Sequence, residues 1–459
     1  MKRTRLLLGA LLCVAGTAAV SAAVKPPLAP TPPMGWNSWD AYGLAITEPE
    51  FRANVDVLAR ELKPYGWNYA VIDEGWFMKN PQDRPTPEKL VLIVDGNGRY
   101  IPDPTRFPSA LEGGRNIGFK AIAAAVHSRG LKFGIHIVRG IPRESVAQNL
   151  PVADSPFHAQ DVADTSDACP WDPTNWGVKD NAAGQAWYDS LIKQYADWGV
   201  DYLKVDCISD HPYKPAEIRM IHNAIAKIGR PIVLSLSPGP TALNVASEVA
   251  AKAQLWRISD DVWDVWTTKG GWPHGIDEHF PVMASWARFS HPGSWPDADM
   301  LPFGYLGPTP GWGDARQTQL TQAEQRSVMT LWAIGRSPLI LGANLTRLDP
   351  FTRSLITNRR IIALDQKTWS SHAVADLPPG FEHAAVWEAS AGPRSRPVRY
   401  VALFNRDNQP ATLSATWAQL GIPGAHSTID LWSGARTKAL PNVTVTLPAH
   451  GSAVYELDR

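Results

Sequence analysis

The chain has 459 residues, of which 44% are hydrophobic and 19% are charged, and this globular composition excludes an intrinsically disordered protein. Lys plus Arg and Asp plus Glu both total 44, so the formal net charge is zero, which argues against nucleic acid as the main partner. The 20 Trp residues are unusually many. Their flat apolar faces suit sugar rings, although they equally suit an ordinary core.

The first 23 residues have the pattern of a secretory signal peptide. Basic residues between positions 2 and 5 precede an apolar run over 6–20, and small residues at 21–23 form a cleavage site. The apolar run is too short for a comfortable membrane span. We therefore expect a mature protein that begins at residue 24, is secreted or periplasmic, and has no membrane association after cleavage.

Residues 24–365 alternate between helical segments and short apolar strands, and four of the helical segments end at a Gly. Such a Gly closes a helix in the left-handed conformation, and continuous apolar runs are typical of buried parallel strands. The expected strands are residues 34–39, 69–73, 132–137, 200–206, 232–235, 255–259, 294–301 and 338–341. Eight such strands predict an α/β fold, a (β/α)8 TIM barrel. An open doubly wound sheet is the alternative, but the sequence lacks its Gly-rich phosphate loop.

The pattern of apolar and polar residues changes after about residue 365. Helical periodicity stops, and short alternating segments at 399–404, 428–432 and 443–447 are separated by turn residues. This pattern predicts a C-terminal antiparallel β-sandwich domain over residues 366–459.

Ionisable residues follow several of the expected barrel strands, at the end where a TIM barrel places its active site. A single carboxylate there often only caps the next helix, but a whole ring of buried charges needs a ligand or mutual pairing. Paired carboxylates point to glycoside hydrolysis, and the absence of a His-x-x-x-His motif or a Cys/His cluster gives no indication of a metal or cofactor. The ring includes Asp73, Glu74, Lys204, Asp206, Arg257, Asp261 and Asp299.

Several ordered motifs make the sequence similar to one family over nearly the whole mature chain. They are PPMGWNSW at 32–39, IDEGW at 72–76, LKVD at 203–206, WRISDD at 256–261 and WPDADML at 295–301. With these motifs the chain resembles glycoside hydrolase family 27, the family of α-galactosidases and α-N-acetylgalactosaminidases. The resemblance implies an exo-glycosidase that acts with retention through a covalent glycosyl-enzyme.

The resemblance also implies roles for individual residues. Asp206 would be the nucleophile and Asp261, four residues after Arg257, the acid/base, with carboxyl groups about 5–5.5 Å apart. Lys204 would favour the ionised form of Asp206. The residues expected to contact the sugar or line its pocket are Trp39, Asp73, Glu74, His136, Lys204, Ser237, Arg257 and Asp299.

Three departures from the family pattern concern the substrate. Glu74 stands where α-galactosidases have a second Asp that faces the O4/O6 side of galactose, and its extra methylene would fill the space of the C6 group. This substitution accompanies β-L-arabinopyranosidase activity in the family. His136 replaces a usual Tyr, and Ser237 replaces a Glu that reads the O2 side, which favours an N-acetylgalactosaminidase only weakly.

We expect α-galactosidase activity first, because it is the commonest in the family, and β-L-arabinopyranosidase activity second. Galactosides or arabinopyranosides are thus the expected partners, and the oligomeric state stays open. A catalytically inactive carbohydrate-binding protein is the non-enzyme alternative, which the presence of both catalytic Asp residues disfavours.

Cys169 and Cys207 are the only cysteines outside the expected signal peptide. Export makes a disulfide between them possible, and two buried free thiols are the alternative. Family members usually bridge a Cys that lies two residues after the nucleophile, whereas Cys207 lies one residue after it. The resemblance therefore implies a relocated bridge that braces the loop of the nucleophile.

Overall fold

The computed structural model describes residues 27–84, 86 and 89–458 of the chain. The expected signal peptide at 1–23 lies outside the described residues. Among the described residues, no helix combines the length and the apolar character needed to cross a bilayer.

Eight parallel strands form the central sheet, as the sequence predicts. In the order in which they pair, they are β12 (Trp295–Asp297), β11 (Leu255–Arg257), β10 (Val233–Leu236), β9 (Tyr202–Asp206), β5 (Lys132–Val138), β2 (Tyr69–Ile72), β1 (Met34–Asn37) and β15 (Leu339–Leu341). A parallel bridge between Leu301 and Leu341 joins the two ends of this order. The fold is therefore a closed (β/α)8 barrel, in which the predicted strand 294–301 is interrupted between Asp297 and Leu301.

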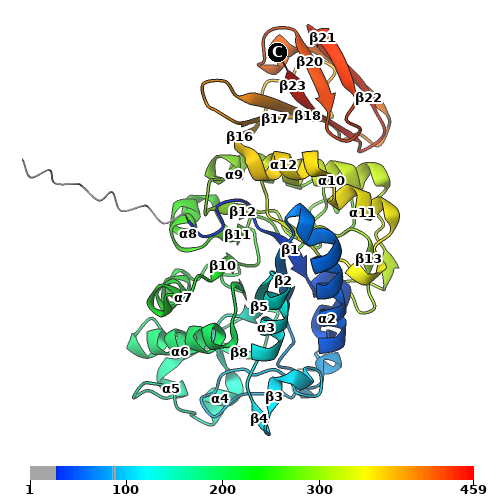
Figure 1. Ribbon diagram of the computed structural model, residues 1–459. Coiled ribbons are helices and arrows are strands. Elements are labelled where there is room, and N and C mark those ends of the chain that lie inside the picture. Colours follow the sequence, from blue (N-terminus) through cyan, green and yellow to red (C-terminus); the bar gives the residue numbers. More distant parts are fainter. Residues whose placement is uncertain (1–26, 85, 87–88, 459) are drawn as a thin grey trace, which may run out of the picture.

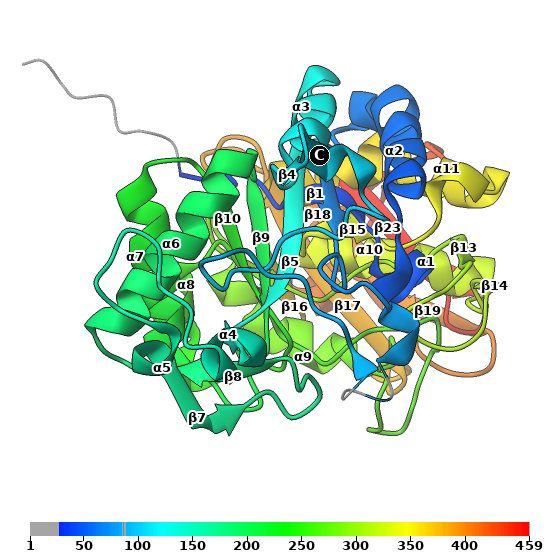
Figure 2. The same ribbon diagram turned by 90° about the horizontal axis from the view of Figure 1, so that it is seen from below.

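Helices cover the outside of these strands. The larger ones are α2 (Glu48–Val57), α3 (Lys120–Ser128), α6 (Ala182–Trp198), α7 (Pro215–Ile228), α8 (Ala246–Lys252), α9 (His279–Trp286), α10 (Gln322–Gly335), α11 (Pro350–Ile356) and α12 (Arg359–Lys367). Figure 2 shows α6, α7 and α8 on one side of the barrel and α2 and α11 on the other. Helices α6 and α7 each end at a Gly in the left-handed conformation, with φ of 90° at Gly199 and 70° at Gly229, as their position predicts.

The loops on the barrel contain shorter elements. They are α1 (Trp39–Tyr42), α4 (Arg143–Ala147), α5 (Ala159–Val162), β3 (Leu111–Glu112), β4 (Arg115–Asn116), β6 (Ile141–Pro142), β7 (Ala163–Ala168), β8 (Asn175–Val178), β13 (Tyr305–Leu306) and β14 (Arg316–Gln317). The connection between β5 and α6 is long, and β6, β8 and β7 form a small sheet there.

The C-terminal part is an antiparallel β-sandwich, which lies at one end of the molecule in Figure 1. Its strands are β16 (Thr368–Ala373), β17 (Ala384–Ala391), β18 (Val398–Asn405), β19 (Ala411–Thr416), β20 (His426–Asp430), β21 (Arg436–Leu440), β22 (Asn442–Leu447) and β23 (Ser452–Asp458). Strands β19 and β22 form one sheet and the other six form the second. Apolar side chains of both sheets, among them Leu403, Leu413 and Val443, share a core.

The sandwich also packs on the barrel. The Phe404 ring of β18 meets Phe280 of α9 edge to face at 5.1 Å, and Arg406 binds Asp277 at 2.7 Å. Phe404 and Phe280 belong to one cluster of buried residues that continues into the barrel. The sandwich is therefore continuous with the core of the barrel.

Candidate active site

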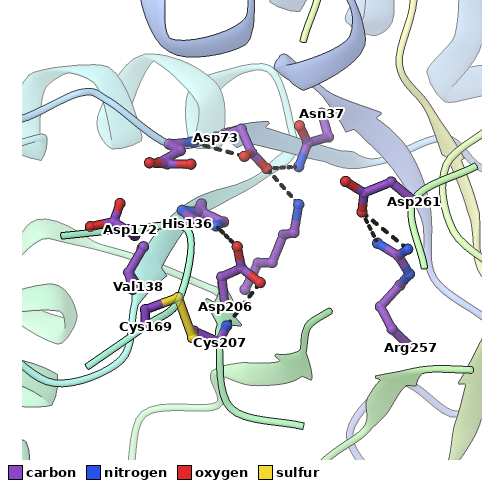
Figure 3. A network of polar contacts seen from close by, with 12 residues as sticks. Asn37, Asp73, His136, Val138, Cys169, Asp172, Asp206, Cys207, Arg257 and Asp261 are labelled. Carbon is purple, nitrogen blue, oxygen red and sulfur yellow. Dashed lines mark hydrogen bonds and ion pairs between the residues drawn. A yellow bond between two sulfur atoms is a disulfide. The ribbon is translucent and has the colours of Figure 1, made fainter. Parts of the chain in front are cut away.

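Asp206 lies at the carboxyl end of β9, where the barrel brings the predicted polar residues together (Figure 3). Its Oδ2 lies 3.6 Å from Nε2 of His136 on β5, an ion-pair distance rather than a hydrogen bond. Its Oδ1 accepts a 2.9 Å hydrogen bond from the backbone N–H of Cys207. Burial raises the pKa of Asp206, but His136, Lys204 and this N–H together lower it below its ordinary value. Asp206 is therefore held as a carboxylate.

Lys204 and Asp73 form the second part of the site. Lys204 lies two residues before Asp206 on the same face of β9, and its Nζ contacts Oδ2 of Asp73 at 3.0 Å. Asn37, at the end of β1, donates to the same oxygen at 2.6 Å. Burial opposes ionisation of Asp73, yet Lys204, followed by His136, lowers its pKa well below the ordinary range. The ammonium of Lys204 thus pairs directly with Asp73 and also lowers the pKa of Asp206.

Arg257 organises a third group of carboxylates at the end of β11. It contacts Asp299 at 2.9 Å and Asp261 at 3.2 Å, and it donates to the backbone oxygen of Ser259 at 3.0 Å. Asp299 has a φ of 81°, a conformation rare for a non-Gly residue, and accepts from the N–H of Val262 at 2.8 Å. Burial raises the pKa of Asp299 to about 6, with Arg257 opposing and the nearby charge of Asp261 adding to the rise.

Figure 3 shows the carboxylates of Asp73, Asp206 and Asp261 around one central region, with Arg257 below Asp261 in this view. Arg257 and Asp299 are almost completely buried. Both side chains are therefore shielded from solvent.

Glu74 follows Asp73 and lies on the other side of the site. Arg84 contacts Glu74 at 3.4 Å and Asp172 at 3.0 Å. Burial, followed by the negative charge of Asp172, raises the pKa of Glu74 well above its ordinary value, whereas Arg84 opposes this rise. The charge of Asp206 contributes in the same direction as that of Asp172, so Glu74 is electrostatically coupled to the nucleophile position.

A disulfide joins Cys169 to Cys207, with Cα atoms 5.9 Å apart. It confirms the predicted bridge and ties the loop after β5 to the residue that follows Asp206, as Figure 3 shows. Cys207 has a φ of 60°, and its backbone oxygen accepts a 2.6 Å hydrogen bond from the buried Arg139. The disulfide to Cys169 and the hydrogen bond from Arg139 thus both hold the turn after β9.

The remaining predicted residues lie as follows. Trp39 is half-buried and packs, with Trp312, against a small buried cluster around Trp263. Ser237 is buried at the end of β10 and its backbone N–H donates to Val205 of β9 at 2.8 Å. All the predicted positions therefore follow barrel strands or lie on them.

Sequence reasoning missed Asn37, Arg84 and Asp172. Asn37 lies inside the first recognised motif, where its strand-end position could have indicated a polar role. Arg84 and Asp172 lie in two irregular loops that are 88 residues apart in the chain. Without a periodic pattern at either position, only the folded chain brings them to Glu74.

Comparisons with known proteins agree with this architecture. The family model for α-galactosidase A matches residues 178–367, and the model for the α-galactosidase C-terminal β-sandwich domain matches residues 385–457. An α-galactosidase from Oryza sativa subsp. japonica is 28% identical over 432 residues, which cover 93% of this chain and 84% of the relative.

Solved structures are more similar. The crystal structure of a family 27 β-L-arabinopyranosidase from Geobacillus stearothermophilus is 38% identical, with a TM-score of 0.85, and the match covers 94% of this chain and 97% of that one. A variant of the same enzyme in complex with arabinose has a TM-score of 0.86 at the same identity, and the match covers 94% of this chain and 98% of that one. The protein is thus a glycoside hydrolase, and it belongs to glycoside hydrolase family 27.

Proposed function

We propose that the protein is a retaining exo-glycosidase that removes terminal β-L-arabinopyranosyl residues in preference to α-D-galactosyl residues. The observation that carries this proposal is Glu74, a carboxyl group one methylene longer than Asp, buried beside Asp73 and held by Arg84. The 38% identity to a β-L-arabinopyranosidase supports it. α-Galactosidase activity is the second candidate, favoured by the curated relatives at lower identity.

The proposed mechanism uses the two aspartates that face the central region. The carboxylate of Asp206 attacks the anomeric carbon while Asp261 gives its proton to the departing glycosidic oxygen. Asp261, now ionised, then removes a proton from a water molecule, and the hydroxide displaces Asp206 with net retention. The low pKa of Asp206 keeps the nucleophile ionised. Arg257 lies 2.9 Å from Asp299 and 3.2 Å from Asp261, so these two carboxyl groups share one guanidinium.

The proposed specificity follows from the difference between the two sugars. β-L-arabinopyranose matches α-D-galactose except that it lacks the exocyclic C6 group. Arg84, itself held by Asp172, keeps the Glu74 carboxyl from moving away from the site. The extra methylene of Glu74 would then occupy the space that the C6 group of galactose requires.

A side-by-side rate comparison tests the specificity. We expect a higher kcat/KM with aryl β-L-arabinopyranoside than with aryl α-D-galactopyranoside. Glu74→Asp should shift the ratio of these two kcat/KM values toward the galactoside by about 10–200-fold, because one methylene in a fitted pocket discriminates by about that much. Glu144→Asp, an exposed Glu on α4, is the matched control. A wild-type preference for the galactoside would refute the proposal and favour the second candidate.

The proposed acid/base is tested by a neighbouring pair of variants. Asp261→Asn should lower kcat/KM for a methyl glycoside by about 10²–10⁴-fold, because the leaving oxygen then lacks a proton donor. The loss should be smaller for a dinitrophenyl glycoside, whose leaving group needs little protonation. Asp260→Asn is the control, and the large loss appearing there instead would reverse the assignment.

We also propose that the barrel and sandwich domains meet at about 365/366, because α12 ends at Lys367 and the first sandwich strand, β16, begins at Thr368.

We further propose that residues 1–23 are removed on export. The disulfide supports export, because such bonds persist mainly in oxidising compartments. Mass spectrometry of the protein from its native host should show a mature chain that starts at residue 24. A chain that retained residues 1–23 would contradict the proposal.

A further inference from the structure

The proposed acid/base indicates where the leaving part of the substrate lies. Asp261 must reach the glycosidic oxygen, so the sugar attached through that oxygen lies directly outside Asp261. The side chain of Asp261 is 35% exposed, whereas that of Asp206 is 15% exposed. The site therefore opens to solvent on the side of Asp261.

The chain that follows Asp261 returns to it and holds an exposed Trp there. The backbone N–H of His274 donates to the backbone oxygen of Asp261 at 2.8 Å, and that of Trp263 donates to the oxygen of His274 at 3.4 Å. Trp272 lies two residues before His274 and is 58% exposed, the largest value among the exposed large apolar side chains of the described residues. Trp272 thus presents an apolar ring to water on the chain segment that returns to Asp261.

Neighbouring aromatic side chains contact Trp272 and hold it in place. Its ring meets Trp312 edge to face at 6.3 Å, and Trp312 in turn packs on the buried Trp263 at 5.6 Å. The guanidinium of Arg316 lies over the Trp312 ring at 5.1 Å and is held by the buried Asp264 at 2.6 Å. These contacts pair the Arg316 guanidinium with Asp264, so Trp312 is held in place beside Trp272.

This aromatic surface continues into the sugar pocket. Gly311, next to Trp312, lies so close to Trp39 that an added Cβ would be 2.4 Å from the indole nitrogen. Trp39 and Trp312 pack on the same small cluster. The aromatic rings therefore extend from the expected wall of the sugar pocket, at Trp39, to the solvent at Trp272.

We propose that Trp272 and Trp312 form an aglycone platform that binds a pyranose ring of an oligosaccharide or polysaccharide directly outside Asp261. The inference rests on the proposed exo-glycosidase function, which places the leaving sugar on this side. Aromatic faces pack well on the apolar C–H face of a pyranose. The natural substrate is then a sugar chain capped by the cleaved residue, rather than a small alkyl glycoside.

The test compares substrates that differ only in the leaving group. For Trp272→Ala we expect kcat/KM to fall about 3- to 10-fold on di- and trisaccharides that carry the cleaved sugar at their non-reducing end, and to stay unchanged on the methyl glycoside. Trp272→Phe, which keeps an aromatic face, should retain most of the oligosaccharide activity. Trp369→Ala is the matched control, since Trp369 lies on β16 of the sandwich and contacts Arg394 there.

Two results would overturn the platform. An equal loss on the methyl glycoside and the oligosaccharides would mean that Trp272 only supports the fold of the loop, and no loss on either would mean that no sugar contacts it. Arabinoside and galactoside series are both measured. A wrong sugar preference then changes which series is cleaved, whereas the platform is judged by the ratio within a series.

Discussion

Asp206 and Asp261 are the same residue type in the same polar region, yet their surroundings differ. Asp206 is surrounded by His136, Lys204 and a backbone N–H, all of which favour its charged form. Asp261 faces one cation, Arg257, which it shares with Asp299, and its side chain has more access to solvent. The two carboxyl groups therefore differ both in their charged neighbours and in their access to solvent.

His136→Gln should move the acidic limb of the pH profile to higher pH. Burial raises the pKa of Asp206, and His136 is the first of the groups that counteract it. Without His136 the carboxyl keeps its proton up to a higher pH, so less nucleophile is ionised under acidic conditions. The profile of kcat/KM, which reports the free enzyme, measures this shift. His222→Gln on α7 is the control, because its ring bonds only Lys252, and an unmoved limb in His136→Gln would contradict the prediction.

The end of β9 depends on elements that lie far apart in the chain. Arg139, directly after β5, donates to Cys207 beyond β9 and contacts Asp167 at 2.9 Å and Glu217 of α7 at 2.8 Å. Burial lowers the pKa of this guanidinium, but Glu217 and then Asp167 more than compensate and raise it above its ordinary value. The nucleophile turn thus rests on a charge-paired residue that belongs to the neighbouring strand.

Arg139→Met should destabilise the protein by about 3–5 kcal/mol, because it leaves Glu217 buried without its cation. Urea unfolding followed by intrinsic fluorescence gives the free energy of unfolding. Arg219→Met removes an exposed pair with Asp180 and should cost less than about 1 kcal/mol. An equal loss of unfolding free energy in the two variants would show that the buried ion pairs of Arg139 stabilise the protein no more than an exposed pair.

At the scale of the whole molecule, the barrel and the sandwich share one buried cluster. Alternate residues of β18 face opposite sides: Phe404 packs on Phe280 of the barrel, whereas Leu403 lies in the core between the two sandwich sheets. The sandwich therefore supports the barrel through packing. Because so much apolar surface is shared, we expect the two parts to unfold together.

Two neighbouring substitutions test this coupling. The wild type should show one calorimetric transition. Phe404→Ala should separate it into two, because the truncation removes about 3–5 kcal/mol of packing energy from the interface between the domains. Leu403→Ala removes a side chain from the same strand but should weaken the sandwich core and leave the interface contacts in place. A single transition in Phe404→Ala would mean that the remaining contacts, such as Arg406 with Asp277, couple the domains by themselves.

The sequence by itself determined the eight strands, the sandwich, the family and the polar residues that lie at strand ends. These features depend on short-range patterns: apolar runs bounded by Gly fix the strands, and residue spacing along one strand fixes which side chains share a face. Lys204 and Asp206 are an example, since a separation of two places both side chains on one face of β9.

Only the tertiary structure decided how the charges pair. It joined Lys204 to Asp73, placed Arg257 between Asp261 and Asp299, and brought Arg84 and Asp172 to Glu74. It also broke the last long strand at Asp299, where a left-handed residue turns the carboxylate toward Arg257. These contacts join residues that are distant in the chain, and their geometry follows from barrel closure and loop packing, which no local pattern encodes.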